Sequence, residues 1–288
     1  MISQNPGRER IDRHIAVRNS GQRGFTLVEL MALLAMLALL AATVPLGMAR
    51  SRTNGREVIC VSNVQRLMGA AQMYAEDNGG RLPGNYHGVE PSRGSSGWAR
   101  GWMDWSSAPS NTNIAYIADE RYANLAGYLQ RNPRVFKCPS DIYLSTYQRA
   151  LGWTQRVRTY SANIGVGEGN AETGPFGTIY KHIRKTSEFV FPGPAENWVY
   201  TEEHPDSIND PAIFAPQATT WVDLPGVFHE GGAAFAFADG HAVMHRWIGS
   251  LTRLRTVTGT YSPPPTANKD PDIHWMSYGA GRLSTYSY

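Results

Sequence analysis

The longest apolar segment of the chain lies near its start. From Leu30 to Ala49 the sequence reads LMALLAMLALLAATVPLGMA, a run without a charged side chain. A helix of about 20 residues rises ~30 Å, which matches the hydrocarbon core of a bilayer. The apolar region of a secretory signal peptide is usually only ~7–15 residues long. The length therefore favours a retained membrane span over a signal peptide that is removed.

A second helical pattern follows the apolar run. Apolar side chains recur there at intervals of three and four, namely Val61, Val64, Leu67, Met68, Ala71 and Tyr74 or Ala75. This spacing is typical of an amphipathic helix that turns one face to a core. Asn78-Gly79-Gly80 indicates its end. We expect one helix from Phe25 to Asp77, with residues 25–49 in the membrane and residues 50–78 forming its amphipathic extramembrane half.

From residue 79 to residue 288 the pattern changes to short strands and many loops, with Gly, Ser and Pro between them. We expect one loop-rich α+β domain, with an antiparallel β-rich sheet packed on the amphipathic half of the helix. The strongest strand signal is Asp239-Gly240, a dipeptide typical of a two-residue hairpin turn. Such a turn would pair Phe237 with Ala242 and Phe235 with Met244.

The formal net charge of +3 is concentrated at the start of the chain. Residues 1–24 hold five arginines against Glu9 and Asp12, so the rest of the chain is about neutral. A neutral body lacks the basic stripe by which proteins bind phosphate backbones, and we exclude nucleic acid as a partner. The basic start also favours a cytoplasmic N-terminus, although Arg50, Arg52 and Arg56 follow the apolar run.

The junction between the basic start and the apolar run carries a specific motif. The segment Arg23–Leu30, RGFTLVEL, resembles the class III signal of prepilins. In that family a dedicated peptidase cuts after the glycine and methylates the new N-terminal phenylalanine. The resemblance implies that residues 1–24 are a leader ending at Gly24, and that Phe25 is the mature N-terminus. It further implies that Glu29 attracts the free amine of a neighbouring subunit.

A carboxylate in a membrane helix costs roughly 2.5–3.5 kcal/mol at mid-bilayer and usually marks function. Glu29 lies in the first turns of the expected helix, where the positive end of the helix dipole and an interfacial depth reduce that cost. The alternative is a carboxylate that reaches the membrane surface without a partner.

The resemblance also implies the partners and the location of the protein. These are a prepilin peptidase, other pilin or pseudopilin subunits, an inner-membrane assembly platform and the lipid bilayer. The chain would cross the inner membrane once, with the N-terminus cytoplasmic and the C-terminal domain periplasmic. A type II secretion pseudopilus and a type IV pilus both remain open. The alternative from another class is a secreted carbohydrate-binding or hydrolytic domain with an ordinary signal peptide.

A second resemblance lies in Phe228–Trp247. His229, nine further residues and then Asp239-Gly240 resemble the H-x9-DG motif of a large pseudopilin-like family. Shorter pieces similar to the same family are spread along the chain, at Cys60–Asn63, Met73–Asn78, Lys137–Asp141, Tyr160–Asn163 and Glu203–Ser207. The resemblance therefore extends over most of the sequence.

The histidines of this region invite a catalytic or metal-binding interpretation. His241 and His245 would lie ~13 Å apart along a strand, too far to share one ion. His229 and Asp239 remain free to meet, and a hydrogen bond that fixes the loop is favoured over catalysis. The sequence contains no Gly-x-Ser-x-Gly, phosphate-loop or His-Glu-x-x-His motif. We therefore expect neither an enzyme nor a cofactor.

Two cysteines and one acidic segment complete the candidate chemistry. Cys60 and Cys138 form no Cys-x-x-Cys pair, so the spacing does not predict a zinc site. In an oxidising compartment we expect a disulfide between them, with two buried thiols as the alternative. The loop Glu202–Asp210 has enough oxygens for Ca²⁺, but a solvated acidic loop is the favoured interpretation.

Overall fold

The computed structural model of the chain describes residues 25–88, 97–169, 181–216, 220–256, 258–259, 261–265 and 269–281, without the side chains of residues 40–54. Gly24 lies outside the described residues. The chain divides into two compact units, residues 1–50 and residues 51–288. It has a mixed α+β fold that combines an N-terminal helix with a five-stranded sheet.

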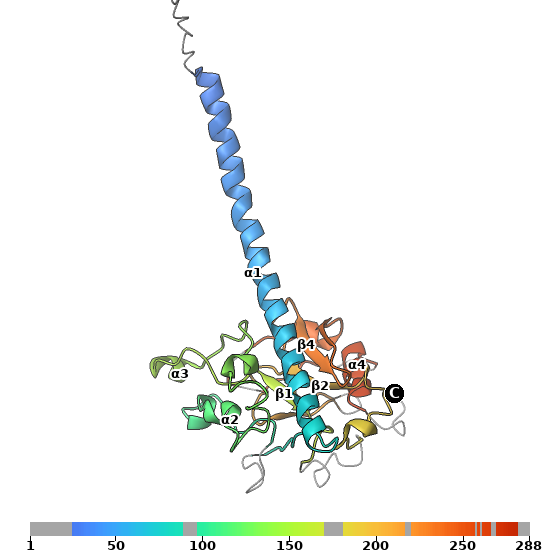
Figure 1. Cartoon of the computed structure of the whole chain (residues 1–288). Coiled ribbons are helices and arrows are strands. Elements are labelled where there is room, and N and C mark those ends of the chain that lie inside the picture. Colours follow the sequence, from blue (N-terminus) through green and yellow to red (C-terminus); the bar gives the residue numbers. More distant parts are fainter. Residues whose placement is uncertain are drawn as a thin grey trace, which may run out of the picture. The chain divides into compact units, whose positions relative to one another are not determined.

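The expected long helix is present as α1, Leu27–Asp77 (Figure 1). The large apolar side chains of residues 25–39, at and just before the start of this helix, are exposed, from 46% at Leu30 to 80% at Phe25. Within the part of the chain that the structure describes, no helix combines the length and the apolar character of a membrane span. The side chains of residues 40–49 of the expected span lie outside the described ones.

The second half of α1 carries the expected core stripe. Val64, Leu67, Met68 and Ala71 are fully buried, together with Cys60, Ala70 and Ala75. Val61 and Tyr74 are partly buried at the edge of this cluster. The helix ends where Gly79 and Gly80 predict. The backbone N–H of Gly80 donates a hydrogen bond to the carbonyl of Ala75 at 2.7 Å, which closes the last turn. Positive φ angles at Gly79 and Gly80 make this terminal bond possible.

The sheet has the strand order β3-β1-β2-β4-β5. Its strands are β1 (Tyr160–Asn163), β2 (Trp198–Glu202), β3 (Ala212–Ile213), β4 (Gly232–Phe237) and β5 (Ala242–Arg246). All pairs are antiparallel except β1 with β3, which run parallel. The expected antiparallel pairing therefore holds for three of the four strand pairs and is wrong for β1 with β3. The connection from β1 to β3 exceeds the dozen residues that a parallel pair requires, and β2 forms within it.

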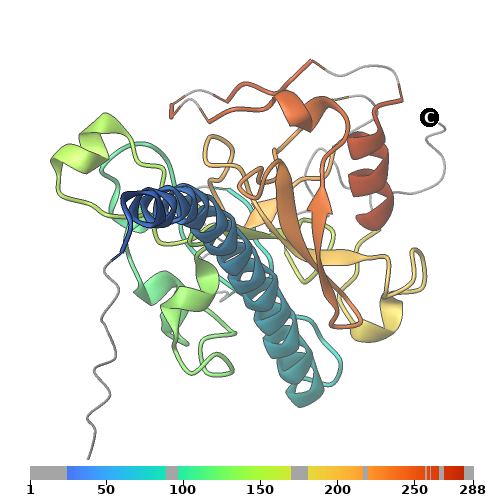
Figure 2. The ribbon, with the colours of Figure 1, turned by 90° about the horizontal axis from the view of Figure 1, so that it is seen from above.

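The sheet lies between two helical layers. One core cluster contains Ala234 and Ala236 of β4 together with the buried stripe of α1. A second cluster contains Phe235 and Phe237 together with residues of α4 (Pro271–Gly279). Figure 2 shows α1 and α4 on opposite sides of β4 and β5. Among the described residues, the shorter helical segments are α2 (Ala115–Ala118), α3 (Thr146–Ala150) and 3₁₀ turns at Pro109–Asn111, Pro133–Phe136, Thr186–Glu188 and Ser250–Arg253.

The β4–β5 hairpin forms where the sequence predicts, but in another register. The partners are Ala236 with Ala242 and Ala234 with Met244, one residue away from the expected pairs. The turn contains three residues, 238–240, and the N–H of Gly240 bonds to the carbonyl of Phe237 at 2.9 Å. Gly240 alone of the three has a positive φ, 97°. A type I turn closed by a glycine matches the strand twist as well as the expected two-residue turn does.

Candidate functional site

The start of α1 is organised by two polar side chains. The Thr26 hydroxyl oxygen accepts the N–H of Glu29 at 3.3 Å, and the Glu29 carboxylate accepts the N–H of Thr26 at 2.9 Å. The Thr26 hydroxyl also donates to this carboxylate at 2.8 Å. These reciprocal bonds form a capping box, whose signature Thr-x-x-Glu is readable in the sequence. The structure thus holds Glu29 in the first turn, four residues after the exposed Phe25.

His229 and Asp239 do not meet, and the predicted contact between them is wrong. The whole of β4 separates them, and a strand of that length extends ~20 Å. Asp239 Oδ1 instead accepts the backbone N–H of His241 at 3.0 Å and lies 2.6 Å from the Nδ1 atom of the same ring. Asp239 therefore stabilises its own turn.

The tip of the hairpin packs against α1. The Gln72 side-chain amide donates to the carbonyl of Ala238 at 3.1 Å. On the other side, the N–H groups of Ala238 and Asp239 donate to the carbonyls of Asn197 and Pro194, at 3.0 Å and 3.2 Å. The Asp-Gly part of the motif thus serves to dock the hairpin tip between α1 and the loop before β2.

The remaining histidines of the hairpin contact aromatic rings. His241 stacks on Phe237 with ring centroids 4.4 Å apart, and His245 stacks on Trp275 at 3.6 Å. Each imidazole therefore stacks on a different aromatic ring.

His229 points into a buried cluster that no spacing in the sequence predicts. Its Nε2 atom lies 3.0 Å from Glu202 Oε1 and 3.4 Å from Cys138 Sγ. Cys60 completes the cluster, and the four possible ligand atoms all lie within 4.8 Å of one another. The four side chains are at most 1% exposed and come from α1, the loop after residue 136, the end of β2 and the loop before β4. We call this set, Cys60, Cys138, Glu202 and His229, the four-residue cluster.

The expected Cys60–Cys138 disulfide is absent, because both cysteines are buried free thiols in the structure. The structure nevertheless brings the two sulfur atoms together, as that prediction requires. Burial raises the pKa of both thiols. Burial alone would favour the neutral imidazole of His229, but the contacts with Cys138 and Glu202 raise its pKa to about 10.

The surroundings of the cluster bring together motifs that are distant in the sequence. The Asn63 amide donates to the carbonyl of Lys137 at 3.2 Å and lies 3.4 Å from the Tyr160 hydroxyl. Lys137 in turn forms a buried ion pair of 2.5 Å with Asp141. The pieces Cys60–Asn63, Lys137–Asp141 and Tyr160–Asn163 therefore have a shared structural role around one buried centre.

The acidic loop Glu202–Asp210 is buried, and the expectation of a solvated loop is wrong. Glu203 is fully buried and accepts hydrogen bonds from the hydroxyls of Ser161 and Ser207. The buried guanidinium groups of Arg156 and Arg158 donate to carbonyls of this loop, to Pro205 at 3.0 Å and to Asp210 at 2.6 Å. Two arginines that are distant from this loop in the sequence therefore compensate its negative charge. Among the described residues, only Glu202 of this loop joins a potential metal-binding group.

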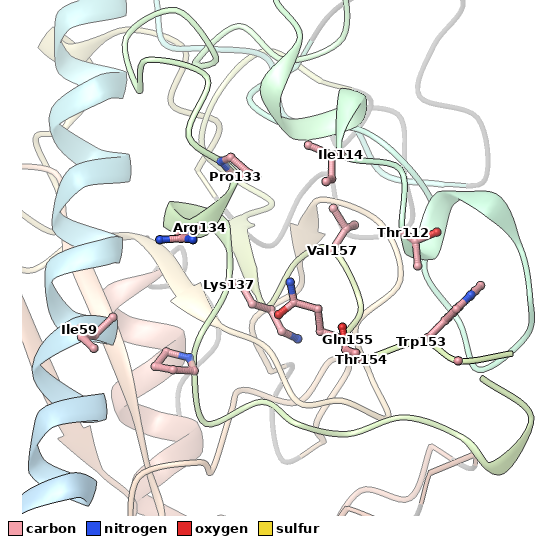
Figure 3. Close-up of a pocket in the computed structure, with 12 residues that line it drawn as sticks. Ile59, Thr112, Ile114, Pro133, Arg134, Lys137, Trp153, Thr154, Gln155 and Val157 are labelled. Carbon is pink, nitrogen blue, oxygen red and sulfur yellow. The ribbon is translucent and has the colours of Figure 1, made fainter. Parts of the chain in front are cut away.

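A cavity of about 600 Å³ lies beside α1 (Figure 3). Apolar side chains such as Ile59, Trp153 and Val157 line it, together with Arg134 and Lys137. The described lining contains no carboxylate, imidazole or thiol.

A family profile described as the prokaryotic N-terminal methylation motif matches residues 19–45. The matched segment is prepilin-like and includes Gly24, Phe25 and Glu29. It supports a precursor of the type IV pilin or pseudopilin kind, with processing by a prepilin peptidase and assembly with other pilin subunits in general. Comparison with curated proteins and with solved structures gives no match. The match ends before the domain, so the H-x9-DG resemblance stays a prediction.

Proposed function

We propose that this chain is a structural subunit of a pilin-like filament. A prepilin peptidase removes residues 1–24 and methylates Phe25, and the mature chain assembles with other subunits in a type II secretion pseudopilus or a type IV pilus-like filament. The observation that carries this proposal is the match of the methylation motif to residues 19–45, across the start of α1.

The exposed apolar side chains of α1 support the proposal. A continuous apolar surface on a helix requires a covering of lipid or protein. The inner membrane provides this covering before assembly, and neighbouring helices provide it in the filament. Glu29 is the single charged residue between Phe25 and Leu39. In such a low-dielectric setting its carboxylate attracts the amine of a neighbouring Phe25 more strongly than it would in water.

The domain, residues 51–288, has a structural role in this proposal. Its sequence contains no Gly-x-Ser-x-Gly, phosphate-loop or His-Glu-x-x-His motif, and the cavity of Figure 3 has no carboxylate, imidazole or thiol among its described lining residues. The domain lies in the periplasm before assembly, and the N-terminus of the precursor is cytoplasmic. The partners are the prepilin peptidase, other subunits and the inner-membrane assembly platform.

N-terminal mass spectrometry of the membrane-fraction protein tests the proposal. We expect a methylated mature start at Phe25. The variant Gly24→Leu should accumulate as full-length precursor, whereas the control Gly21→Leu, inside the leader, should still be cleaved. A mature start between Ala42 and Ser51 would contradict the proposal and favour the secreted carbohydrate-binding or hydrolytic domain.

A further inference from the structure

We propose that the four-residue cluster of Cys60, Cys138, Glu202 and His229 is a structural zinc site. Around a tetrahedral zinc ion with Zn–S near ~2.3 Å and Zn–N or Zn–O near ~2.0–2.1 Å, neighbouring ligand atoms lie ~3.3–3.8 Å apart. The separations of 3.4 Å from His229 Nε2 to Cys138 Sγ and 3.0 Å from His229 Nε2 to Glu202 Oε1 are close to such edges. All four atoms lie within 4.8 Å of one another, so small side-chain shifts complete the tetrahedron.

The chemistry of the donors selects the metal. Two sulfurs, one imidazole nitrogen and one carboxylate oxygen suit zinc, whereas Ca²⁺ and Mg²⁺ prefer oxygen ligands throughout. Each cysteine loses its thiol proton to solvent when it binds the ion. All four ligands come from the protein and are at most 1% exposed. A closed, fully protein-ligated site of this kind stabilises a fold and leaves no open position for a substrate.

Backbone groups around the cluster orient its ligand atoms. The N–H of Ser140 points to Cys138 Sγ at 3.4 Å, as expected around a thiolate. The N–H of Ala234 donates to Glu202 Oε2 at 2.8 Å, which leaves Oε1 directed at His229. Among the described residues, His229 Nδ1 has no hydrogen-bond partner. Nε2 is the ring nitrogen that faces Glu202 Oε1 and Cys138 Sγ.

A disulfide is the competing arrangement for the two sulfurs. It requires an S–S bond of ~2.05 Å and no other ligand. It does not account for an imidazole nitrogen beside one sulfur and a carboxylate oxygen beside that nitrogen, all converging from separate segments. A zinc ion accounts for all four groups and ties α1 and β2 to the loops that hold Cys138 and His229. The site lies within residues 51–288 and does not depend on filament assembly.

Metal titration of the full chain in detergent tests this site. The reduced protein is stripped with a chelator under anaerobic conditions and titrated with Co²⁺, then with Zn²⁺. We expect one ion per chain, visible bands of tetrahedral Co²⁺ with thiolate-to-cobalt charge transfer, and loss of these bands on addition of Zn²⁺. At 100-fold excess over the dissociation constant, zinc should raise the Tm by roughly 5–10 °C.

Substitutions inside and outside the cluster show whether its residues bind the metal or only pack in the core. Removal of a residue that only hydrogen-bonds a metal ligand typically lowers the metal affinity roughly 10–100-fold. Cys138→Ser and His229→Gln remove ligands themselves, so they should weaken Co²⁺ binding by more than this. His204→Asn, in a buried histidine outside the cluster, should leave the affinity unchanged. Because Cys60 still provides one thiolate, the thiolate-to-cobalt bands of Cys138→Ser should persist at reduced intensity. Full intensity of these bands together with unchanged affinity in Cys138→Ser, or unchanged affinity in His229→Gln, would overturn the proposal.

The native chain provides a test that needs no substitution. Protein isolated from the envelope without reductant is analysed for metal content and intact mass. One zinc per chain, with both thiols alkylated only after chelation and denaturation, would support the site. A chain without zinc whose mass is lower by the two thiol hydrogens would overturn it and restore the Cys60–Cys138 bridge.

Discussion

The hydroxyl of Thr26 lies 2.8 Å from the carboxylate of Glu29, one turn into α1. Glu29 therefore has a partner within its own chain, in addition to the amine of a neighbouring subunit that the proposed assembly requires. The two roles differ in what they demand of the side chain. A cap requires a hydrogen-bond acceptor, whereas attraction of an amine requires a negative charge.

The variant Glu29→Gln separates these roles. Leucine at this position, in Glu29→Leu, would remove both the charge and the cap, and we expect filament incorporation to fall sharply. Glutamine retains the capping box but removes the charge, so we expect the same sharp fall in Glu29→Gln. The control Thr26→Val removes the hydroxyl at a cost of ~1 kcal/mol to the start of the helix and should assemble normally. Cross-linked oligomers and precursor size on gels measure the two effects. Normal polymerisation of Glu29→Gln would show that the carboxylate serves as a cap alone.

Gly240→Ala should destabilise the domain by ~2 kcal/mol. Its φ of 97° disfavours any side chain, and an added Cβ would lie 3.2 Å from the Gln72 amide. Gly152→Ala is a matched control, because Gly152 has a φ of 78° but open space around it. We expect it to cost ~1 kcal/mol. Urea unfolding measures both, and equal losses would show that the contact with Gln72 has no energetic effect.

Leu67→Ala should lower the free energy of unfolding by ~2–5 kcal/mol. Leu67 is fully buried in the core cluster between α1 and the sheet. Val58→Ala, on the same helix at a side chain that is 68% exposed, should change stability by no more than ~0.5 kcal/mol. Thermal and urea unfolding of both variants provide the comparison. A small effect of Leu67→Ala would mean that α1 is not held by its apolar stripe.

Stability should fall between pH 6.5 and pH 4 because of His204. Burial lowers the pKa of this histidine from 6.5 to about 4. Its Nδ1 atom accepts the N–H of Asp206 at 3.2 Å, which an imidazolium cannot do. The unfolded chain binds the proton first, so the stability present above pH 6.5 is lost as the pH falls toward 4, by roughly 2–3 kcal/mol.

His204→Asn provides the control for this pH dependence. Asparagine keeps an acceptor near the position of Nδ1 but does not titrate. Urea unfolding at several pH values should therefore show a flatter profile between pH 6.5 and pH 4 in the variant. An unchanged slope would assign the acid sensitivity to another group, such as His245, whose pKa burial also lowers to about 4.

The sequence alone determined the local elements of this protein. The stripe around Leu67 and Met68 predicts the buried face of α1, because helical spacing places these side chains on one side whatever they pack against. Asn78-Gly79-Gly80 predicts the end of the helix, because glycine readily adopts a positive φ. The prepilin-like motif is equally local, since a peptidase reads a short contiguous segment, and the methylation-motif match includes it.

Only the tertiary structure decided which distant residues meet. The hairpin register depends on how the tip docks against Gln72, and the parallel pairing of β3 depends on a long connection. The acidic loop is buried because Arg156 and Arg158 lie against it. Glu202 joins His229 and the cysteines because a strand end, two loops and a helix face converge in the core. Long-range contacts of this kind have no characteristic spacing along a chain, so no pattern in the sequence predicts them.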